Sequence, residues 1–192
     1  MAENDQDQTP VAQPAEDQAG QRFGIQHVYV KDVSFEAPDT PNVFRQQYSP
    51  QVNFSINNRS NKIEEGIFEV VLRLTADVKQ EDKTVFLVEV QQAGVFEISG
   101  IEGEQLERVL TINCPNILFP YGREAIDALV TRGSFPALRL APINFETIYL
   151  QAKQQHEQQA AAAPDEISEA EIITPDSVNK FPSVHYSYNL ID

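Results

Sequence analysis

The sequence predicts an α+β fold in which antiparallel strands come first and helices follow. Apolar residues recur at every second position through much of Phe23 to Ile98, which is typical of half-buried strands. After Gly103 the apolar spacing becomes helical. The 192 residues include 41% hydrophobic residues, so one folded domain is expected rather than a fully disordered chain.

Four strands are expected along the first half of the chain. Their apolar, β-branched and aromatic residues place them at residues 23–35, 52–56, 67–78 and 85–98. The polar run Asn57 to Asn61 is expected to end the second strand. The charged link 79–83 is short enough to join the last two strands as a hairpin. With short links between successive strands, we expect an antiparallel meander.

Helices are expected in the second half. A short helix after Gly103 should end before Pro115, which suits the first turn of a second helix because proline has no N–H to satisfy there. That second helix should end at Gly133, with a kink or a delayed start near Pro120. Asn144 is a good N-cap for a last helix.

The acidic charge divides the chain into three parts. The sequence holds 14 Lys and Arg against 29 Asp and Glu, a net charge of −15. Residues 1–20 carry −5, residues 155–192 carry −6, and the stretch between them carries −4. We therefore expect a disordered acidic tail at 1–20, a folded domain at 21–154, and an acidic, mostly disordered C-terminal extension at 155–192.

The composition also limits the partners and the location. An acidic protein lacks the basic surface that nucleic acids and anionic membranes require. The first twenty residues have neither the basic nor the apolar region of a signal peptide, and no apolar run reaches the roughly 18 residues of a membrane helix. A cytoplasmic protein is expected.

No catalytic residue, metal site or cofactor is expected. Cys114 stands where a helix N-terminus would lower its pKa, but a buried structural thiol is the simpler interpretation. The three histidines, His27, His156 and His185, lack the spacing of zinc ligands. No glycine-rich phosphate loop and no Ser/His/Asp pattern is present.

Four segments resemble the SecB family of export chaperones. They are Val30–Pro38 (VKDVSFEAP), Phe86–Phe96 (FLVEVQQAGVF), Cys114–Glu124 (CPNILFPYGRE) and Leu140–Phe145 (LAPINF). They occur in the family's order across residues 22–155. The segment beyond Pro164 is longer than expected for the family, and the resemblance does not cover it.

The resemblance implies a non-enzymatic holdase built as a homotetramer, a dimer of dimers. It implies that unfolded precursor proteins bind in extended apolar grooves and pass to SecA, the ATPase motor of the Sec translocon. The same resemblance assigns roles to residues. The client groove would include Phe44, Tyr48, Phe119, Tyr121, Phe135 and Leu138.

Two further sets follow from the resemblance. The basic, zinc-bearing C-terminal segment of SecA would bind Asp32, Ser34, Glu36, Leu87 and Glu89. The positions tied to tetramer assembly are Phe86, Val88, Val90 and Gln92. From the residues alone, the aromatic groove residues equally suit a core, the acids suit the solvent side of a strand, and Gln92 suits either a subunit contact or an edge.

Alternatives remain at this point. The chain could be a SecB-like chaperone dedicated to a toxin–antitoxin system, or a structural adaptor without clients. The C-terminal segment contains Phe181, Tyr186, Tyr188, Leu190 and Ile191. It is either a disordered tail with scattered aromatic residues, or a pseudo-substrate that docks into the client groove of its own or a neighbouring chain.

Overall fold

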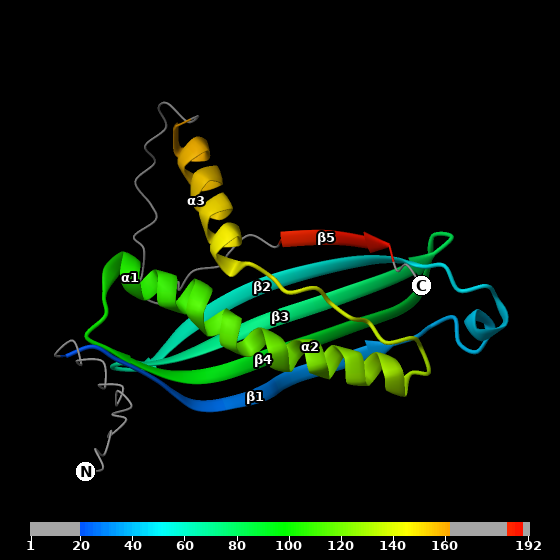
Figure 1. The fold of residues 1–192 in the computed structure, drawn as a ribbon, viewed down its shortest axis with the longest axis horizontal. Helices are drawn as coiled ribbons and strands as arrows, with labels where there is room; N and C mark the ends of the chain where they lie inside the picture. Colours follow the sequence, from blue (N-terminus) through cyan, green and yellow to red (C-terminus); the bar gives the residue numbers. More distant parts are fainter. Residues whose placement is uncertain (1–19, 162–183, 190–192) are drawn as a thin grey trace, which may run out of the picture.

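The computed structural model describes residues 20–161 and 184–189 and has the predicted α+β architecture (Figure 1). The strands are β1 (Arg22–Glu36), β2 (Gln51–Glu64), β3 (Ile67–Gln80), β4 (Lys83–Ser99) and β5 (Val184–Asn189). The helices are the 3-10 helix η1 (Asn42–Arg45), α1 (Gly103–Arg108), the π-helical segment η2 (Val109–Asn113), α2 (Cys114–Arg132) and α3 (Phe145–Ala161).

All five strands form one antiparallel sheet in the order β1-β4-β3-β2-β5. The four predicted strands are therefore present, but the predicted meander is wrong, because β1 pairs with β4 and not with β2. Residues 37–50, which include η1, separate β1 from β2. A hairpin needs only a few connecting residues, and this longer link lets β1 reach the far side of the sheet.

The predicted hairpin between β3 and β4 is confirmed. Its two turn residues, Glu81 and Asp82, have φ of 50° and 62°, the left-handed backbone that a tight two-residue hairpin turn requires. The expected end of β2 at Asn57 is wrong, since the strand continues to Glu64. Asn58 can lie on the buried face because its Nδ2 donates a hydrogen bond to the Leu110 carbonyl of η2.

The first two predicted helices are one continuous helical segment. Asn113 and Cys114 both have right-handed helical φ and ψ, so the helix does not end before Pro115. A π-helical turn lets the helix continue through Pro115, which has no N–H to donate. In this turn the Cys114 N–H donates to the Val109 carbonyl five residues back. Gly133 ends α2 as predicted, and Ser134 after it takes the left-handed conformation, with φ of 65°.

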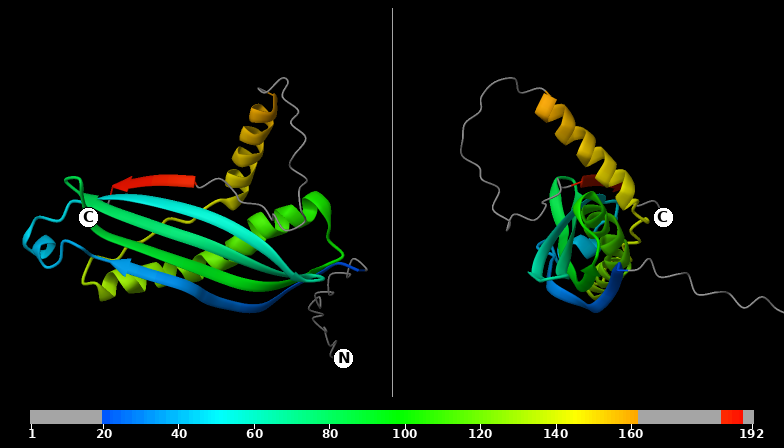
Figure 2. Two further views of the ribbon diagram at one scale, coloured as in Figure 1. Left: turned by 180° about the vertical axis from the view of Figure 1, so that it is seen from behind. Right: turned by 90° about the vertical axis from the view of Figure 1, so that its left-hand side faces the viewer.

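The α2 helix lies across one face of the sheet and the core fills the space between them (Figure 1). Gly122 sets how closely the helix approaches, because a Cβ at this position would lie 2.6 Å from Leu74 Cδ1. We call this covered side the inner face. Viewed from behind, the strands lie in front of α2 (Figure 2), and this side is the outer face.

The last helix begins where the sequence predicts. The Thr147 N–H donates to Asn144 Oδ1 over 3.1 Å, which is the expected N-cap bond. The helix α3 projects from the body of the molecule (Figure 2), and two ion pairs join it to α1. Arg108 contacts Glu146, and Lys153 contacts Glu104, each over 2.7 Å.

Two predictions about the ends of the chain concern regions that the structure describes only in part. Residues 1–19 of the predicted N-terminal tail lie outside the described residues. The last helix crosses the expected domain boundary at 154 and continues to Ala161. Residues 184–189 form β5, a strand that the sequence does not predict because no hairpin turn links it to its partner β2. Of the apolar C-terminal residues, Phe181, Leu190 and Ile191 lie outside the described residues.

Candidate functional site

The strand register brings the five predicted SecA-binding residues together on the outer face. Ser34 of β1 lies opposite Glu89 of β4, and Glu36 lies opposite Leu87. Asp32 is opposite Gln91, whose Nε2 donates to Asp32 Oδ2 over 3.3 Å. Paired residues in an antiparallel ladder share a face. We call this group, Asp32, Ser34, Glu36, Leu87 and Glu89, the acidic patch.

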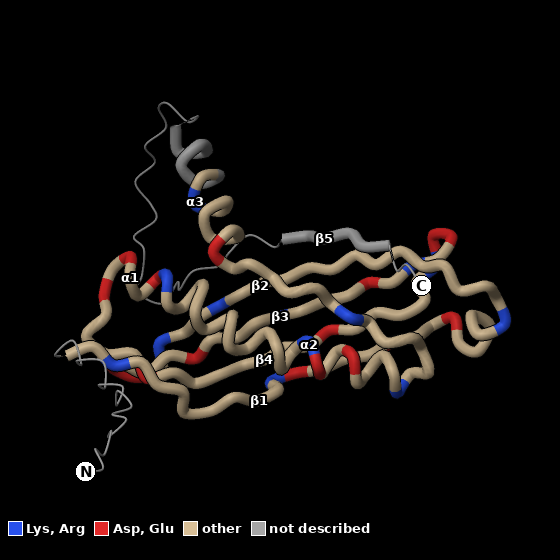
Figure 3. Tube along the Cα trace, viewed as in Figure 1, with Lys and Arg blue, Asp and Glu red and all other residues tan. Residues whose placement is uncertain are grey.

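The charges of the acidic patch are only partly compensated. Glu89 Oε2 accepts a hydrogen bond from Arg73 over 2.7 Å and another from Thr75 Oγ1 over 3.3 Å. Among the described residues, Asp32 and Glu36 form no ion pair. Figure 3 marks the Asp and Glu positions of the described residues in red along the trace. The patch therefore keeps unpaired negative charge around the half-buried Leu87.

One residue of this surface was missed from the sequence. Asp77 of β3 lies opposite Leu87 on the side away from Glu36, so carboxylates flank the leucine on both sides. Lys79 Nζ contacts Asp77 over 2.9 Å. The alternation of β3 already placed Asp77 on the solvent side, but only the register shows that it faces Leu87.

Farther along the outer face the charge is neutralised. The Tyr29 hydroxyl donates to Glu69 over 2.5 Å, and Lys31 Nζ lies 2.6 Å from the same oxygen. Burial raises the pKa of Glu69, but the hydrogen bonds from Lys31 and Tyr29 outweigh it and hold the pKa below its usual value. The hydrogen bond to Glu69, with burial, raises the pKa of Tyr29 to about 12. Uncompensated acidity is thus concentrated at the Leu87 end.

The predicted groove residues divide into buried and exposed groups. Phe44 and Tyr121 are 51% and 54% exposed, and Tyr48 is half-buried. The other three are buried: Phe119, Phe135 and Leu138. The core interpretation therefore holds for these three in the single chain.

An aromatic cluster gathers three of these residues at one end of the sheet. Phe135 lies at its centre, 4.8 Å from the Phe86 ring and 5.3 Å from the Phe44 ring, measured between centroids. Phe35 and Tyr48 complete the cluster at 6.2 Å and 6.5 Å from Phe135. Because Phe44 is half-exposed, the cluster presents one aromatic side chain to solvent, and this side chain packs on buried aromatic rings.

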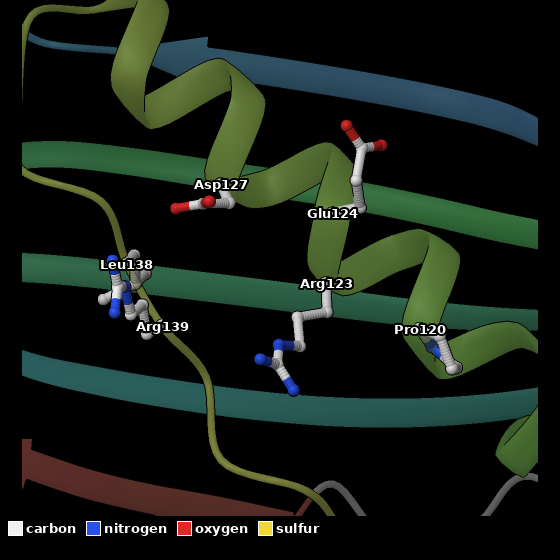
Figure 4. A pocket seen from close by; sticks show the side chains of 6 residues that line it. All are labelled: Pro120, Arg123, Glu124, Asp127, Leu138 and Arg139. Carbon is white, nitrogen blue, oxygen red and sulfur yellow. The ribbon is translucent and has the colours of Figure 1, made fainter.

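A pocket lies between α2 and the segment that follows it. It has a volume of about 260 Å³ and is lined by Pro120, Arg123, Glu124, Asp127, Leu138 and Arg139. Figure 4 shows Arg123 extending from the helix toward the chain segment that carries Leu138 and Arg139. We call it the α2 pocket. It combines apolar side chains with charges of both signs, a surface that suits varied extended segments better than one fixed ligand.

The four predicted assembly residues belong to the core of the single chain. Phe86, Val88, Val90 and Gln92 are each at most 2% exposed and lie on the inner face of β4. Gln92 Nε2 donates to the Tyr29 carbonyl over 2.9 Å, so its amide binds within the chain. These residues lie on the strand that pairs with β1 and do not form an outer surface themselves.

An apolar row on β1 was not identified from the sequence. Phe23, Ile25, Val30 and Val33 are between 44% and 50% exposed, yet they lie opposite inner-face residues of β4. Irregularities between Ile25 and His27 and between Val30 and Asp32 keep these residues on one face. We call these four the β1 row. Its spacing does not follow a period of two, so the common face of these residues appears only in the register, and their exposure follows from β1 being an edge strand.

Comparisons with known proteins identify the family. A family model described as Preprotein translocase subunit SecB matches residues 16–156. The chain belongs to the SecB family. SecB is a family of protein-export chaperones, so the predicted resemblance and the predicted chaperone function are confirmed. The comparisons favour export over a dedicated toxin–antitoxin chaperone.

The chain is similar to curated SecB proteins over most of its length. It is 51% identical over 166 residues to the Protein-export protein SecB of Marinobacter nauticus, covering 86% of this chain and 98% of the relative. It is 52% identical over 144 residues to the protein of the same name from Hahella chejuensis, covering 74% and 91%. A solved SecB-like chaperone of Mycobacterium tuberculosis, in complex with an antitoxin peptide, aligns with a TM-score of 0.53 at 15% identity, covering 64% of this chain and 91% of that one. This last likeness shows the fold alone.

The thiol of this SecB chain does not have the environment of a nucleophile. Cys114 is fully buried, and burial raises its pKa to about 12. Within residues 20–161 and 184–189, no group of three or more His, Cys, Asp or Glu is arranged to hold a metal ion. None of the helices in the described part is long and apolar enough to span a membrane.

Proposed function

We propose that this SecB chaperone holds unfolded precursor proteins on apolar surfaces of the inner face and presents the acidic patch of the outer face to SecA. The observation that carries the proposal is the register of β1 and β4, which pairs Ser34 with Glu89 and Glu36 with Leu87. Because side chains alternate along a strand, the same two strands carry a different surface on each side. One chain can then bind a client and a motor at once.

The client surface comprises the α2 pocket, the aromatic cluster and Tyr121. Exposed aromatic side chains beside a mixed pocket accept many apolar sequences without demanding one shape. Holding a client in this way requires no bond making, so the protein acts without catalytic residues or cofactors. We place this activity in the cytoplasm, where precursors exist before export.

The motor surface is the acidic patch. Its partner is the basic, zinc-bearing C-terminal segment of SecA, and its unpaired carboxylates give the charge complementarity that such a contact needs. Leu87, with Glu36 on one side and Asp77 on the other, adds an apolar contact at the centre. Any zinc in this complex belongs to SecA.

We further propose that the protein is a homotetramer, a dimer of dimers, in which subunit contacts cover the β1 row. Four large apolar side chains, each about half-exposed on an edge strand, favour burial against another chain. Phe86, Val88, Val90 and Gln92 then act on assembly indirectly, because they lie on the strand that pairs with β1 and help to hold β1 in place.

Charge reversal tests the motor surface. We expect Glu36→Lys and Glu89→Lys each to weaken binding of the isolated zinc-loaded SecA segment by about tenfold or more, since each replaces attraction with repulsion. Glu89→Lys also removes the ion-pair partner of Arg73, so Glu36→Lys changes the charge of the patch with fewer side effects. Glu65→Lys makes the same charge change in the turn between β2 and β3 and should leave affinity unchanged. Equal affinities in calorimetric titrations of all variants would refute the acidic patch assignment.

Native mass spectrometry separates a chaperone from a structural adaptor. A tetramer that binds one precursor diluted from urea, and ignores the same precursor once folded, supports the chaperone. A complex formed only with a folded partner supports the adaptor.

A further inference from the structure

The outer edge of β2 is occupied by the C-terminal strand of the same chain. Gln51 to Ile56 of β2 pair antiparallel with Asn189 to Val184 of β5. Figure 1 shows β5 lying along β2 at the border of the sheet. We propose that this edge is a strand-addition site for unfolded polypeptide, and that β5 is its displaceable intramolecular occupant. The inference rests on the proposed holdase function.

Main-chain pairing suits a partner that varies in sequence. A strand added to a sheet edge is held by backbone N–H and C=O groups, which every residue except proline supplies. Such an edge, left open, pairs readily with other chains. For a holdase the same property is useful, because an extended client segment has unpaired backbone groups along its whole length.

The register favours a segment with alternating apolar residues. Val52, Phe54 and Ile56 of β2 are buried on the inner face, with at most 4% exposure. In β5 the residues opposite them are Tyr188, Tyr186 and Val184, and the polar residues of this strand occupy the intervening positions. Any segment with the same alternation extends the sheet in the same way.

The edge also borders the proposed client surface. In Figure 4 the segment carrying Leu138 and Arg139 crosses the inner face, and β5 lies beyond β2 on that side of the view. Gln80 Nε2 donates to the Gln47 carbonyl, and its Oε1 accepts from the Ser49 N–H, which fixes the approach to β2. A client strand on β2 would thus extend the sheet that carries the α2 pocket. In the single chain, residues 184–189 lie on this edge and not in the α2 pocket, whereas docking into the groove of a neighbouring chain stays a prediction.

Covalent attachment makes β5 an effective competitor. Residues 162–183 connect α3 to β5, and a linked segment competes at an effective concentration up to about the millimolar range. If β5 occupies the edge about nine-tenths of the time, the apparent affinity for a client strand falls about tenfold, because only the open fraction binds.

Truncation after residue 183 tests this competition in an otherwise intact chain. The chain 1–183 should bind a fluorescent peptide of residues 183–192 about tenfold more tightly than the full chain does. The full-length variant Y186P/S187P should bind the peptide as tightly as 1–183 does. Successive N–H groups of a strand point to opposite edges, so one of the two prolines must remove a hydrogen bond to β2. S177P in the connecting segment is the control and should behave as the full chain. Circular dichroism verifies that each variant is folded.

Backbone methylation tests the mode of binding. One peptide carries N-methyl groups at residues 184, 186 and 188, and another carries them at 185, 187 and 189. Strand addition predicts that one pattern abolishes binding to 1–183 while the other preserves it. Equal binding of the two would overturn the inference.

An unfolded precursor diluted from urea completes the test. It should displace the unmethylated peptide from 1–183 and bind 1–183 about tenfold more tightly than the full chain. Equal precursor affinity for both chains overturns the inference while leaving the holdase function intact. No precursor binding to either chain overturns both.

Discussion

At the scale of residues, Asn58 shows how one side chain replaces a missing backbone donor. In an α-helix the Leu110 carbonyl would accept from the Cys114 N–H, but this N–H is bonded to Val109. In the π-helical register the donor would be residue 115, which is a proline without an N–H. Asn58 Nδ2 donates to the Leu110 carbonyl instead, over 3.1 Å. A polar residue inside β2 thus allows a proline inside the helix.

Removing this donor should destabilise the protein. Asn58→Ala leaves the buried Leu110 carbonyl unsatisfied, so we expect the free energy of unfolding to fall by about 1–3 kcal/mol. Urea denaturation at fixed protein concentration measures the change. Asn61→Ala, at an exposed position of the same strand, should change it by less than about 0.5 kcal/mol. Equal stabilities of the two variants would contradict the assigned role.

The buried thiol gives a pH-dependent prediction. The pKa of Cys114 is raised by burial from 9.0 to about 12, so the folded chain keeps the neutral thiol. At pH 8, iodoacetamide should label Cys114 in urea but not in the folded protein, as mass spectrometry would show. Between pH 9 and 12 the thiol ionises only in the unfolded chain, and the stability that it contributes is lost as the pH rises. Rapid labelling of the folded chain would contradict this environment.

At the scale of elements, β1 shows what the sequence can and cannot predict. Strict alternation from Phe23 would place His27 and Lys31 on the inner face, but two extra residues shift the phase and keep apolar residues there. The alternation of Asp32, Ser34 and Glu36 lies past the second shift, so it was predicted correctly. The local alternation of apolar residues predicts that β1 is a strand. Its pairing with β4 depends on contacts between residues far apart in the sequence.

The candidate site was predictable to different degrees for the same reason. Local pattern identified the carboxylates, but only register places Asp77 beside Leu87. Aromatic residues such as Phe135 have the same pattern in a core and in a groove, and burial alone separates them. The strand β5 was missed although Val184, Tyr186 and Tyr188 alternate with polar residues, because no turn links it to its partner strand, which lies more than a hundred residues away.

The contact between α2 and the sheet depends on Gly122. Gly122→Val would place side-chain atoms against Leu74, so we expect a loss of about 1–3 kcal/mol in unfolding free energy. Combining it with Leu74→Ala creates space, and the double variant should be more stable than the sum of the two single changes predicts. Urea denaturation of the four chains measures the coupling. Strict additivity would mean that the two residues do not meet.

At the scale of the whole molecule, the β1 row links the single chain to its assembly. Val33→Asp changes a residue that is 46% exposed, so the subunit should still fold, but a buried carboxylate would oppose subunit contact. We expect the tetramer to dissociate into smaller species in native mass spectra. Leu150→Asp makes a similar change on α3 at equal exposure and should leave the tetramer intact. A tetramer that survives Val33→Asp would move the contact elsewhere.

The two faces of the sheet have a consequence for how such a chain can change. Along β4, odd positions from Leu87 to Gln91 face the acidic side and even positions from Phe86 to Gln92 face the helix. The two surfaces are thus formed by alternate residues of one strand. Point substitutions can revise either surface without touching the other. A single inserted or deleted residue would exchange them, turning carboxylates inward and apolar side chains outward, so we expect relatives to vary this strand by substitution and to keep its length.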